Sequence, residues 1–118
     1  MQLNTWIKNS LFFSLFFQKL EEFPDALQKV TGNLRNLDLS QNKIVSIPRW
    51  ISSFKVLKTL NISSNKITQL PEEIGDLIKL ENLLVSGNLL RALPRSLGKF
   101  FKAETQLTVW NNVKFTLT

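Results

Sequence analysis

The chain contains no cysteine and no histidine among its 118 residues. These absences exclude disulfides, thiol nucleophiles, metal sites built on cysteine or histidine, and any catalytic centre that uses a histidine base. Because extracellular domains of this size usually depend on disulfides, the lack of cysteine indicates a reducing compartment. We therefore expect a cytoplasmic protein.

Long apolar runs are also missing. No segment approaches the roughly 20 apolar residues that a membrane-spanning helix needs. The most apolar stretch, residues 11–17, is followed by glutamine and charged residues, with no small-residue cleavage pattern. The sequence therefore argues against a secretory leader.

The residues that are present fit one globular domain. Hydrophobic residues make up 43% of the chain, which is enough to bury a core and to exclude wholesale disorder. Fifteen basic residues against nine acidic ones give a formal net charge of +6 and a pI near 9.9. This charge allows an acidic partner without identifying one.

A repeat of 23 residues organises the middle of the chain. Three sets of residues recur at this interval: Leu34, Leu57 and Leu80; Asn42, Asn65 and Asn88; Pro48, Pro71 and Pro94. The three blocks share the pattern L-x-x-L-x-[LIV]-x-x-N-x-[IL]-x-x-[IL]-P-x-x-[IL]-x-x-[LF]. A match over so many positions predicts a solenoid in which each block forms one turn.

Each block begins with an alternation of period two, which predicts a short strand with every second side chain facing inward. Strands of successive blocks would pair in parallel and stack their inward side chains into one continuous core. The residues expected there are Leu37, Leu39, Leu60, Ile62, Leu83 and Val85.

The recurrent asparagine and proline have separate physical roles. The chain turns inward after the strand, where an asparagine amide can both donate to and accept from buried backbone groups. Proline lacks an amide donor and suits the first turn of a short helix. Apolar residues after it return to the core at spacing three, and they are Ile51, Phe54, Ile74, Leu77, Leu97 and Phe100.

Both ends of the array are irregular. In the first repeat Phe13 and Leu15 occupy strand positions, Gln18 replaces the asparagine, and one residue is inserted near Gly32. Downstream, the positions that fit with one insertion are Leu107, Val109, Asn112 and Leu117, while Lys114 does not fit. We divide the chain into a leader of uncertain structure (1–10), four repeats (11–102) and a tail (103–118). The tail is either a degenerate terminal strand or unrelated sequence.

The outward strand positions form three columns across the predicted sheet, and the concave face of a solenoid is the usual place for a broad protein contact. The candidate protein-binding residues are Asn36, Asp38, Ser40, Thr59, Asn61, Ser63, Asn82, Leu84 and Ser86, with Trp110 on a terminal strand. They either form a polar docking strip with Leu84 as its apolar spot, or only keep an exposed sheet soluble.

Aromatic residues gather near the amino end. On this threading Phe12 and Phe16 point outward on the first strand, so they could anchor a partner. The alternative is that Phe12, Phe16 and Phe17 cover the open end of the solenoid beneath Trp6 and Ile7. An end repeat has to hide its apolar edge, so we expect capping rather than binding.

Basic residues are not expected to form a single stripe. Lys43 and Lys66 share a position after the strand, but Glu72 interrupts the row that contains Arg49 and Arg95. Nucleic-acid binding needs aligned cations with aromatic stacking partners. The sequence therefore argues against nucleic acid as a partner and favours a solvated basic surface.

The sequence provides no chemistry for an enzyme. Glu72, Glu73 and Asp76 cluster, but they are expected in the first turn of a helix, where carboxylates stabilise the positive end of the helix dipole. The sequence has no glycine-rich phosphate loop, no serine nucleophile with a base and no metal-ligand cluster. We expect no catalytic, cofactor-binding or metal-binding residues, and no cofactor.

The segment LPEEIGDL at 70–77 resembles the intracellular, Ras-suppressor type of leucine-rich repeat, and residues 23–44, with their insertion, are similar to the opening of the leucine-rich repeat-containing protein fifty-seven family. This resemblance implies an α/β fold: a leucine-rich repeat solenoid with a curved parallel β-sheet on its concave face and short helical or 3-10 turns on its convex face. It further implies a small adaptor without assigned chemistry, and scaffolding of small-GTPase signalling. That family commonly begins with a glycine suited to myristoylation, whereas Gln2 follows Met1 here, so the lipid anchor is not carried over.

The first hypothesis is a non-catalytic protein-interaction module or adaptor in intracellular signalling. Its partner would be another protein, which the resemblance suggests is a small GTPase or its regulator. One alternative is a membrane-peripheral protein held by the Phe-rich amino end and a basic surface. Another is a truncated product without independent function.

Overall fold

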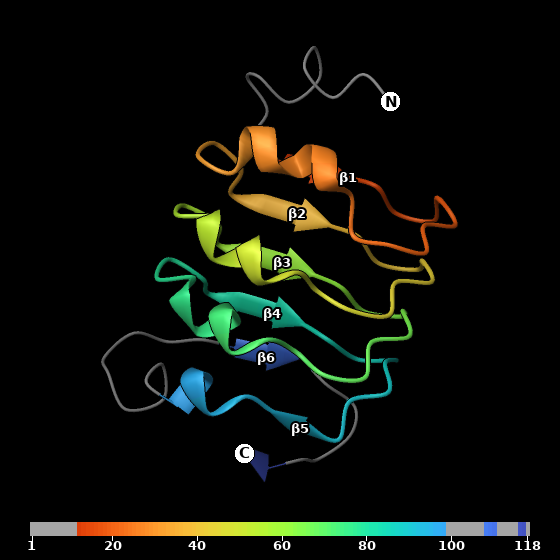
Figure 1. Cartoon of the computed structure of the whole chain (residues 1–118), viewed down its shortest axis with the longest axis vertical. Helices are drawn as coiled ribbons and strands as arrows, with labels where there is room; N and C mark the ends of the chain where they lie inside the picture. The colour runs from red at the N-terminus through yellow and green to blue at the C-terminus, as the bar shows by residue number, and fades with distance from the viewer. Residues whose placement is uncertain (1–11, 99–107, 111–115, 118) are drawn as a thin grey trace.

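The computed structural model describes residues 12–98, 108–110 and 116–117, in which the chain winds as a coil with one short strand in each turn (Figure 1). A 3-10 turn lies opposite each of the strands β1–β4. The elements in chain order are β1 (Phe12–Ser14), η1 (Asp25–Val30), β2 (Asn36–Asp38), η2 (Arg49–Ser53), β3 (Thr59–Asn61), η3 (Glu72–Asp76), β4 (Asn82–Leu84), β5 (Ala92–Leu93), η4 (Arg95–Leu97), β6 (Thr108–Trp110) and β7 (Thr116–Leu117).

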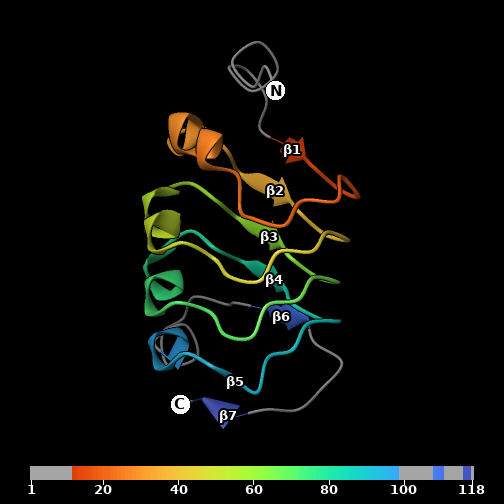
Figure 2. The ribbon, with the colours of Figure 1, turned by 45° about the vertical axis from the view of Figure 1, so that its right-hand side comes forward.

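The strands pair in parallel in the order β1-β2-β3-β4-β6, and β5 and β7 form a second, two-stranded sheet. Phe13, Leu37, Leu60 and Leu83 are register partners from one strand to the next. Figure 2 shows the large sheet on one side of the molecule and the 3-10 turns on the other. The predicted α/β solenoid, with one turn in each repeat, is therefore confirmed.

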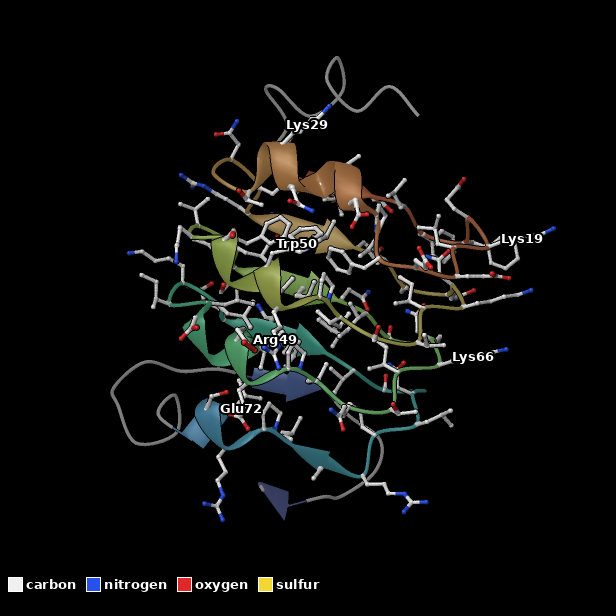
Figure 3. All side chains as sticks on the ribbon, in the orientation of Figure 1. Lys19, Lys29, Arg49, Trp50, Lys66 and Glu72 are labelled. Carbon is white, nitrogen blue, oxygen red and sulfur yellow. The ribbon has the colours of Figure 1, made fainter. Side chains whose placement is uncertain are left out.

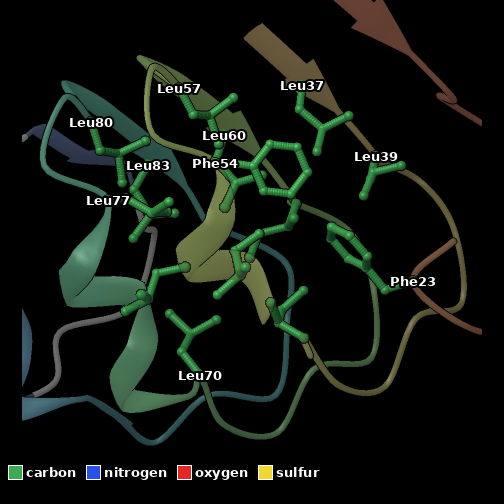
Figure 4. Packing of buried hydrophobic residues seen from close by; sticks show 14 of the residues in the cluster. Phe23, Leu37, Leu39, Phe54, Leu57, Leu60, Leu70, Leu77, Leu80 and Leu83 are labelled. Atoms are coloured by element: carbon green, nitrogen blue, oxygen red, sulfur yellow. The ribbon is translucent and has the colours of Figure 1, made fainter. Parts of the chain in front are cut away.

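A single hydrophobic core fills the space between the sheet and the 3-10 turns. The inward strand residues Leu37, Leu60 and Leu83 are buried, and Phe54 and Ile74 reach the same cluster from the other side (Figure 4). Burying a large apolar side chain stabilises the fold by roughly 1.5–3 kcal/mol before entropy is counted. Because the cluster runs from Leu15 to Leu97 without a break, each repeat is stabilised by its neighbours.

The asparagine after each strand is a clamp between successive repeats. The amide nitrogen of Asn65 donates to the carbonyl of Leu39 in the preceding repeat at 3.0 Å and to Ile62 in its own repeat at 3.0 Å. Its amide oxygen accepts from the backbone N–H of Ile44 at 3.0 Å. The prediction that this amide donates and accepts in a buried setting is confirmed.

Two further asparagines repeat the clamp. Asn42 donates to the carbonyl of Leu15 and accepts from the N–H groups of Gln18 and Leu20. Asn88 donates to Ile62 at 2.9 Å and accepts from Ile67 at 3.1 Å. In the first repeat Gln18 occupies this position. Its backbone N–H donates to the amide oxygen of Asn42, the clamp of the next repeat.

Each recurrent proline stands immediately before a 3-10 turn rather than inside its first turn. The carbonyls of Pro48, Pro71 and Pro94 accept from the N–H three residues later at 3.0–3.1 Å, which closes the first hydrogen bond of the turn. Glu72 and Glu73 do lie in the first turn of η3. The prediction was wrong for Asp76, which ends η3, because the turn is only five residues long.

The residue before each asparagine has a left-handed backbone. The φ angles are 54° at Gln41, 54° at Ser64 and 72° at Gly87, and the matching residue of the first repeat, Phe17, has a φ of 55°. This conformation reverses the chain so that the asparagine can enter the core. Glycine adopts it without steric cost, whereas the three side chains retain some strain.

Two expectations for the irregular ends were wrong. Strand β1 ends at Ser14, so Phe16 lies in the turn after the strand and not on it. Val109 pairs with Leu83 and not with the position of Val85, which shifts the expected threading of this segment by two residues. Leu117 pairs with Leu93 as the expected threading had it. The two-residue shift at Val109 is lost again by Leu117, because the connection from β6 to β7 is shorter than the equivalent connection from β4 to β5.

Several residues named from the sequence lie outside the described part of the chain. They are Trp6, Ile7, Phe100, Leu107, Asn112 and Lys114. Phe12, Phe13, Val109 and Trp110 are placed by their backbone in strands, and their side chains are not described.

Replacing Asn65 with Ala should lower the free energy of unfolding by roughly 1–3 kcal/mol, because it leaves the Ile44 N–H buried without a partner, while the Leu39 carbonyl keeps its bond from Asn42. Chemical denaturation would measure the loss. The neighbouring exposed change Lys66→Ala is the control and should stay within about 0.5 kcal/mol of the wild type. Equal losses for the two variants would refute the clamp.

Replacing Leu60 with Ala should lower the free energy of unfolding by roughly 2–5 kcal/mol, because the side chain is fully buried between Leu37 and Leu83. The exposed Lys58→Ala provides a control on the same repeat. Thermal unfolding followed by circular dichroism would detect the difference. A silent Leu60→Ala would show that this position is not in the core.

Candidate functional site

The outer face of the large sheet, called the strand face below, is the first candidate surface. Its residues stand in three rows that cross the strands: Asn36, Thr59 and Asn82; Ser14, Asp38, Asn61 and Leu84; Ser40, Ser63 and Ser86. Adjacent strands in a sheet lie about 4.8 Å apart, so each row places side chains at that spacing. All but Ser40 are partly or fully exposed. The structure therefore brings the nine predicted strand-face residues of β2–β4 and their following turns together.

Polar side chains of the middle row are held in place by serines. A carboxylate oxygen of Asp38 accepts from the Ser40 N–H at 2.9 Å and from the Ser40 hydroxyl at 2.6 Å. The amide oxygen of Asn61 accepts in the same way from the Ser63 N–H at 3.1 Å and the Ser63 hydroxyl at 2.6 Å. The second carboxylate oxygen of Asp38 and the amide nitrogen of Asn61 have no hydrogen-bond partner among the described residues. These two groups are available to a ligand in a fixed orientation.

Ser40 differs from its prediction as an exposed contact residue. Only 6% of it is exposed, because the loop of the preceding repeat covers it. Its carbonyl accepts from the Phe17 N–H at 3.2 Å and from the Asn42 amide at 3.2 Å, while its hydroxyl binds Asp38. Ser40 positions Asp38 and does not offer a surface of its own. The spacing of an Asp or Asn two residues before a serine is the sequence signal for this pairing.

Leu84 interrupts the polar middle row. It pairs in register with Asn61 on β3 and with Trp110 on β6, so the strand face changes from polar to apolar at β4. Ser86 stands two residues later without the acceptor side chain that Ser40 and Ser63 have. The backbone of Trp110 lies beside Leu84 on the sheet, and its side chain lies outside the described residues.

The second candidate surface is the row of loops that follow strands β1–β4, called the loop edge below. It consists of residues 16–19, 41–43, 64–66 and 87–89. Lys19, Lys43 and Lys66 occupy equivalent positions on successive loops, and Figure 3 shows Lys19 and Lys66 on the same side of the molecule. The sequence placed Lys43 and Lys66 at one position, and the structure extends this row to Lys19. The alignment of Gln18 with the asparagine already implies that Lys19 follows at the same position.

Exposed apolar side chains share the loop edge with these lysines. Phe16 is 47% exposed, Phe17 is 62% exposed, and Leu89 on the fourth loop is 61% exposed. The rings of Phe16 and Phe17 have centroids 6.0 Å apart. The predicted burial of these two phenylalanines as an end cap is not what the structure shows. The capping prediction for Phe12 concerns a side chain outside the described residues.

An open groove of about 760 Å³ lies between η2, η3 and β5. Its walls include Arg49, Glu72, Glu73 and Arg91. The Glu72 carboxylate accepts from the Ser96 N–H at 3.1 Å and so ties η3 to η4. No hydroxyl of the described lining is hydrogen-bonded to a carboxylate as a nucleophile would be to its base, so the groove does not indicate a reaction.

Two other kinds of site are absent from residues 12–98, 108–110 and 116–117. These residues contain no group of three or more acidic side chains that could hold a metal ion. No helix in the same residues is long and apolar enough to cross a bilayer.

Comparisons with known proteins agree with this geometry. A family model described as leucine rich repeat matches residues 32–90. The leucine-rich repeat ectodomain of the receptor kinase SOBIR1 from Arabidopsis thaliana is 27% identical, with a TM-score of 0.61 over 82% of this chain. The Leptospira interrogans leucine-rich repeat protein LIC12759 has the same fold, at 23% identity and a TM-score of 0.66 over 93% of this chain. The match covers 54% of the SOBIR1 ectodomain and 35% of LIC12759.

Replacing Leu84 with Asn should leave the free energy of unfolding within about 1 kcal/mol of the wild type. The new amide oxygen would face Ser86 as Asn61 faces Ser63, and these hydrogen bonds would offset the lost apolar contact. Urea denaturation would measure the change. A loss as large as that of a core leucine would show that Leu84 points into the core.

Proposed function

Because this chain belongs to the leucine-rich repeat family, we propose that it is a non-catalytic protein-interaction module that presents its strand face to another protein. Leucine-rich repeat solenoids generally use their extended sheet surface to bind proteins. The order of the strand face is the observation that carries the proposal. Three rows of side chains stand in register across β2, β3 and β4.

Two properties of the middle row favour binding over simple solubility. First, Asp38 and Asn61 are oriented by serine hydroxyls, so little side-chain entropy is lost when a partner binds them. Second, Leu84 provides an apolar contact directly beside Asn61. A polar surface whose only purpose was solubility would need neither feature.

The charge of the strand face indicates which chemical groups a partner would present. Among the described residues of this face, Asp38 alone is charged. Neutral hydrogen-bonding groups dominate the remainder. We therefore expect a partner segment rich in backbone or amide groups, with a cation near Asp38 and an apolar side chain near Leu84.

The resemblance to Ras-suppressor-like repeats supports a role as an adaptor or scaffold in cytoplasmic signalling, and it suggests a small GTPase or its regulator as the partner. The absence of cysteine supports the cytoplasmic location. A non-enzymatic role is supported by the family, whose members are typically interaction modules, and by the lack of histidine and cysteine.

Affinity capture from a cell extract, with the full chain immobilised, would test the proposal. The strand-face variant is Asp38→Ala/Asn61→Ala/Leu84→Asn, and it should lose any specific partner by at least about 10-fold, because interface energy is concentrated in a few residues. The matched control changes three exposed residues on the other side of the coil, Ser53→Ala/Lys55→Ala/Lys79→Ala. It should retain the partner.

Proteins captured equally by the wild type and both variants would be nonspecific and would not support the proposal. If the control loses a partner that the strand-face variant keeps, the 3-10 side of the coil is the interaction surface. Circular dichroism of each variant would verify that the fold is intact.

A further inference from the structure

We infer that the loop edge binds the surface of an anionic lipid bilayer peripherally. This inference concerns a different surface from the strand face and does not depend on the proposed function. It rests on the coincidence of exposed apolar side chains and a row of lysines on the same set of loops.

Apolar exposure is concentrated on the loop edge. Five large apolar side chains are exposed in the described part of the chain: Phe16, Phe17, Val45, Ile78 and Leu89. Three of them belong to the loop edge, and Val45 stands two residues beyond Lys43. Of the three, Phe16 also stands at the register position of Ser40, in the third row of the strand face. Exposed apolar groups that gather on one surface mark a contact with a partner or a membrane, whereas scattered ones do not.

The backbone fixes the lysine row. The N–H of Lys43 donates to the Leu20 carbonyl at 2.7 Å, and that of Lys66 donates to the Ile44 carbonyl at 2.8 Å. These two loops are therefore tied to the preceding repeat, on rungs about 4.8 Å apart. Lys19, on the first loop, differs from them in having a left-handed backbone with a φ of 58°. Within the described residues no carboxylate pairs with Lys19, Lys43 or Lys66. The loop edge itself contains no acidic residue.

The kind of cation favours lipid over protein. Lysine is depleted in protein interfaces, where arginine and aromatic residues are enriched, because its ammonium group is costly to dehydrate. At a bilayer surface the ammonium groups stay hydrated beside phosphate and carboxylate headgroups while neighbouring apolar groups enter the interface. All three cations of the loop edge are lysines. Nucleic acid is a weaker fit, since the phenylalanines occupy one end of the row and do not alternate with the lysines.

The loop edge has the geometry of a surface contact. The loops lie side by side along one margin of the coil (Figure 2). The phenylalanines belong to the first of these loops and Leu89 to the fourth. Phe16 and Phe17 would insert at the headgroup boundary while the three lysines meet the charged surface. Bound in this way, the protein keeps the strand-face residues of β2–β4 open, because they lie on the sheet, and only Phe16 is shared by the two surfaces.

Vesicle co-sedimentation of the full chain would test the inference, with phosphatidylcholine vesicles that either contain or lack phosphatidylserine. The wild type should sediment with the phosphatidylserine vesicles and lose binding as salt is raised. Lys19→Gln/Lys43→Gln/Lys66→Gln should lower the partition coefficient by roughly 10–100-fold. The control Lys29→Gln/Lys55→Gln/Lys79→Gln removes the same charge from the side of the 3-10 turns and should lower it by less than about 3-fold.

The apolar part of the contact needs its own pair of variants. Phe17→Ser should weaken binding to the phosphatidylserine vesicles several-fold, whereas Ile78→Ser, which removes a side chain of 60% exposure after η3, should not. All of these positions are exposed, so thermal unfolding should confirm an intact fold in each variant.

Three results would overturn the inference. The wild type could fail to sediment with either vesicle, or the two lysine triples could lose binding equally, which would indicate attraction by net charge alone. Soluble poly-glutamate could also bind the wild type as tightly as the vesicles do, without any effect of Phe17→Ser. That last result would identify an acidic protein as the occupant.

Discussion

An asparagine amide after each of the strands β2, β3 and β4 holds that turn of the coil to the turn before it. The strand has to stop and the chain has to enter the core, which leaves carbonyl and N–H groups of two repeats without sheet partners. One amide satisfies both kinds of group, as Asn65 does for Leu39, Ile62 and Ile44. An apolar residue there would leave the Ile44 N–H unpaired, at roughly 1–3 kcal/mol, and would remove one of the two asparagine donors from each carbonyl. The leucine core supplies most of the stabilisation, but the clamp sets the register at which the leucines stack.

Both candidate surfaces follow from this winding. The alternation along each strand places every second side chain outside, and parallel pairing arranges those side chains in rows that a long partner can follow. The left-handed residue and the asparagine then direct the next side chain outward at the loop, where it is lysine in three successive repeats. One regular backbone thus presents a neutral hydrogen-bonding face and a separate basic edge.

Residues that depart from the repeat pattern are the best candidates for specific binding. Leu84 replaces the polar residue that Asp38 and Asn61 provide on the neighbouring strands. Phe16 stands where the later repeats have serine, and Phe17 stands where they have Gln41, Ser64 and Gly87. The core does not require either change, because all three side chains lie outside it. Each adds an apolar contact at the margin of a polar surface, in the arrangement that interfaces commonly have.

The period of 23 residues was sufficient to predict the parallel sheet, the inward leucines, the buried asparagines and the 3-10 turns after proline. Such features depend on interactions between equivalent positions, and a repeated sequence specifies those interactions directly. Tertiary structure alone decided the burial of Ser40 by the preceding loop, the end of β1 at Ser14 and the pairing of Val109 with Leu83. These features depend on how one segment packs against its neighbour in space. The repeat pattern does not specify that contact.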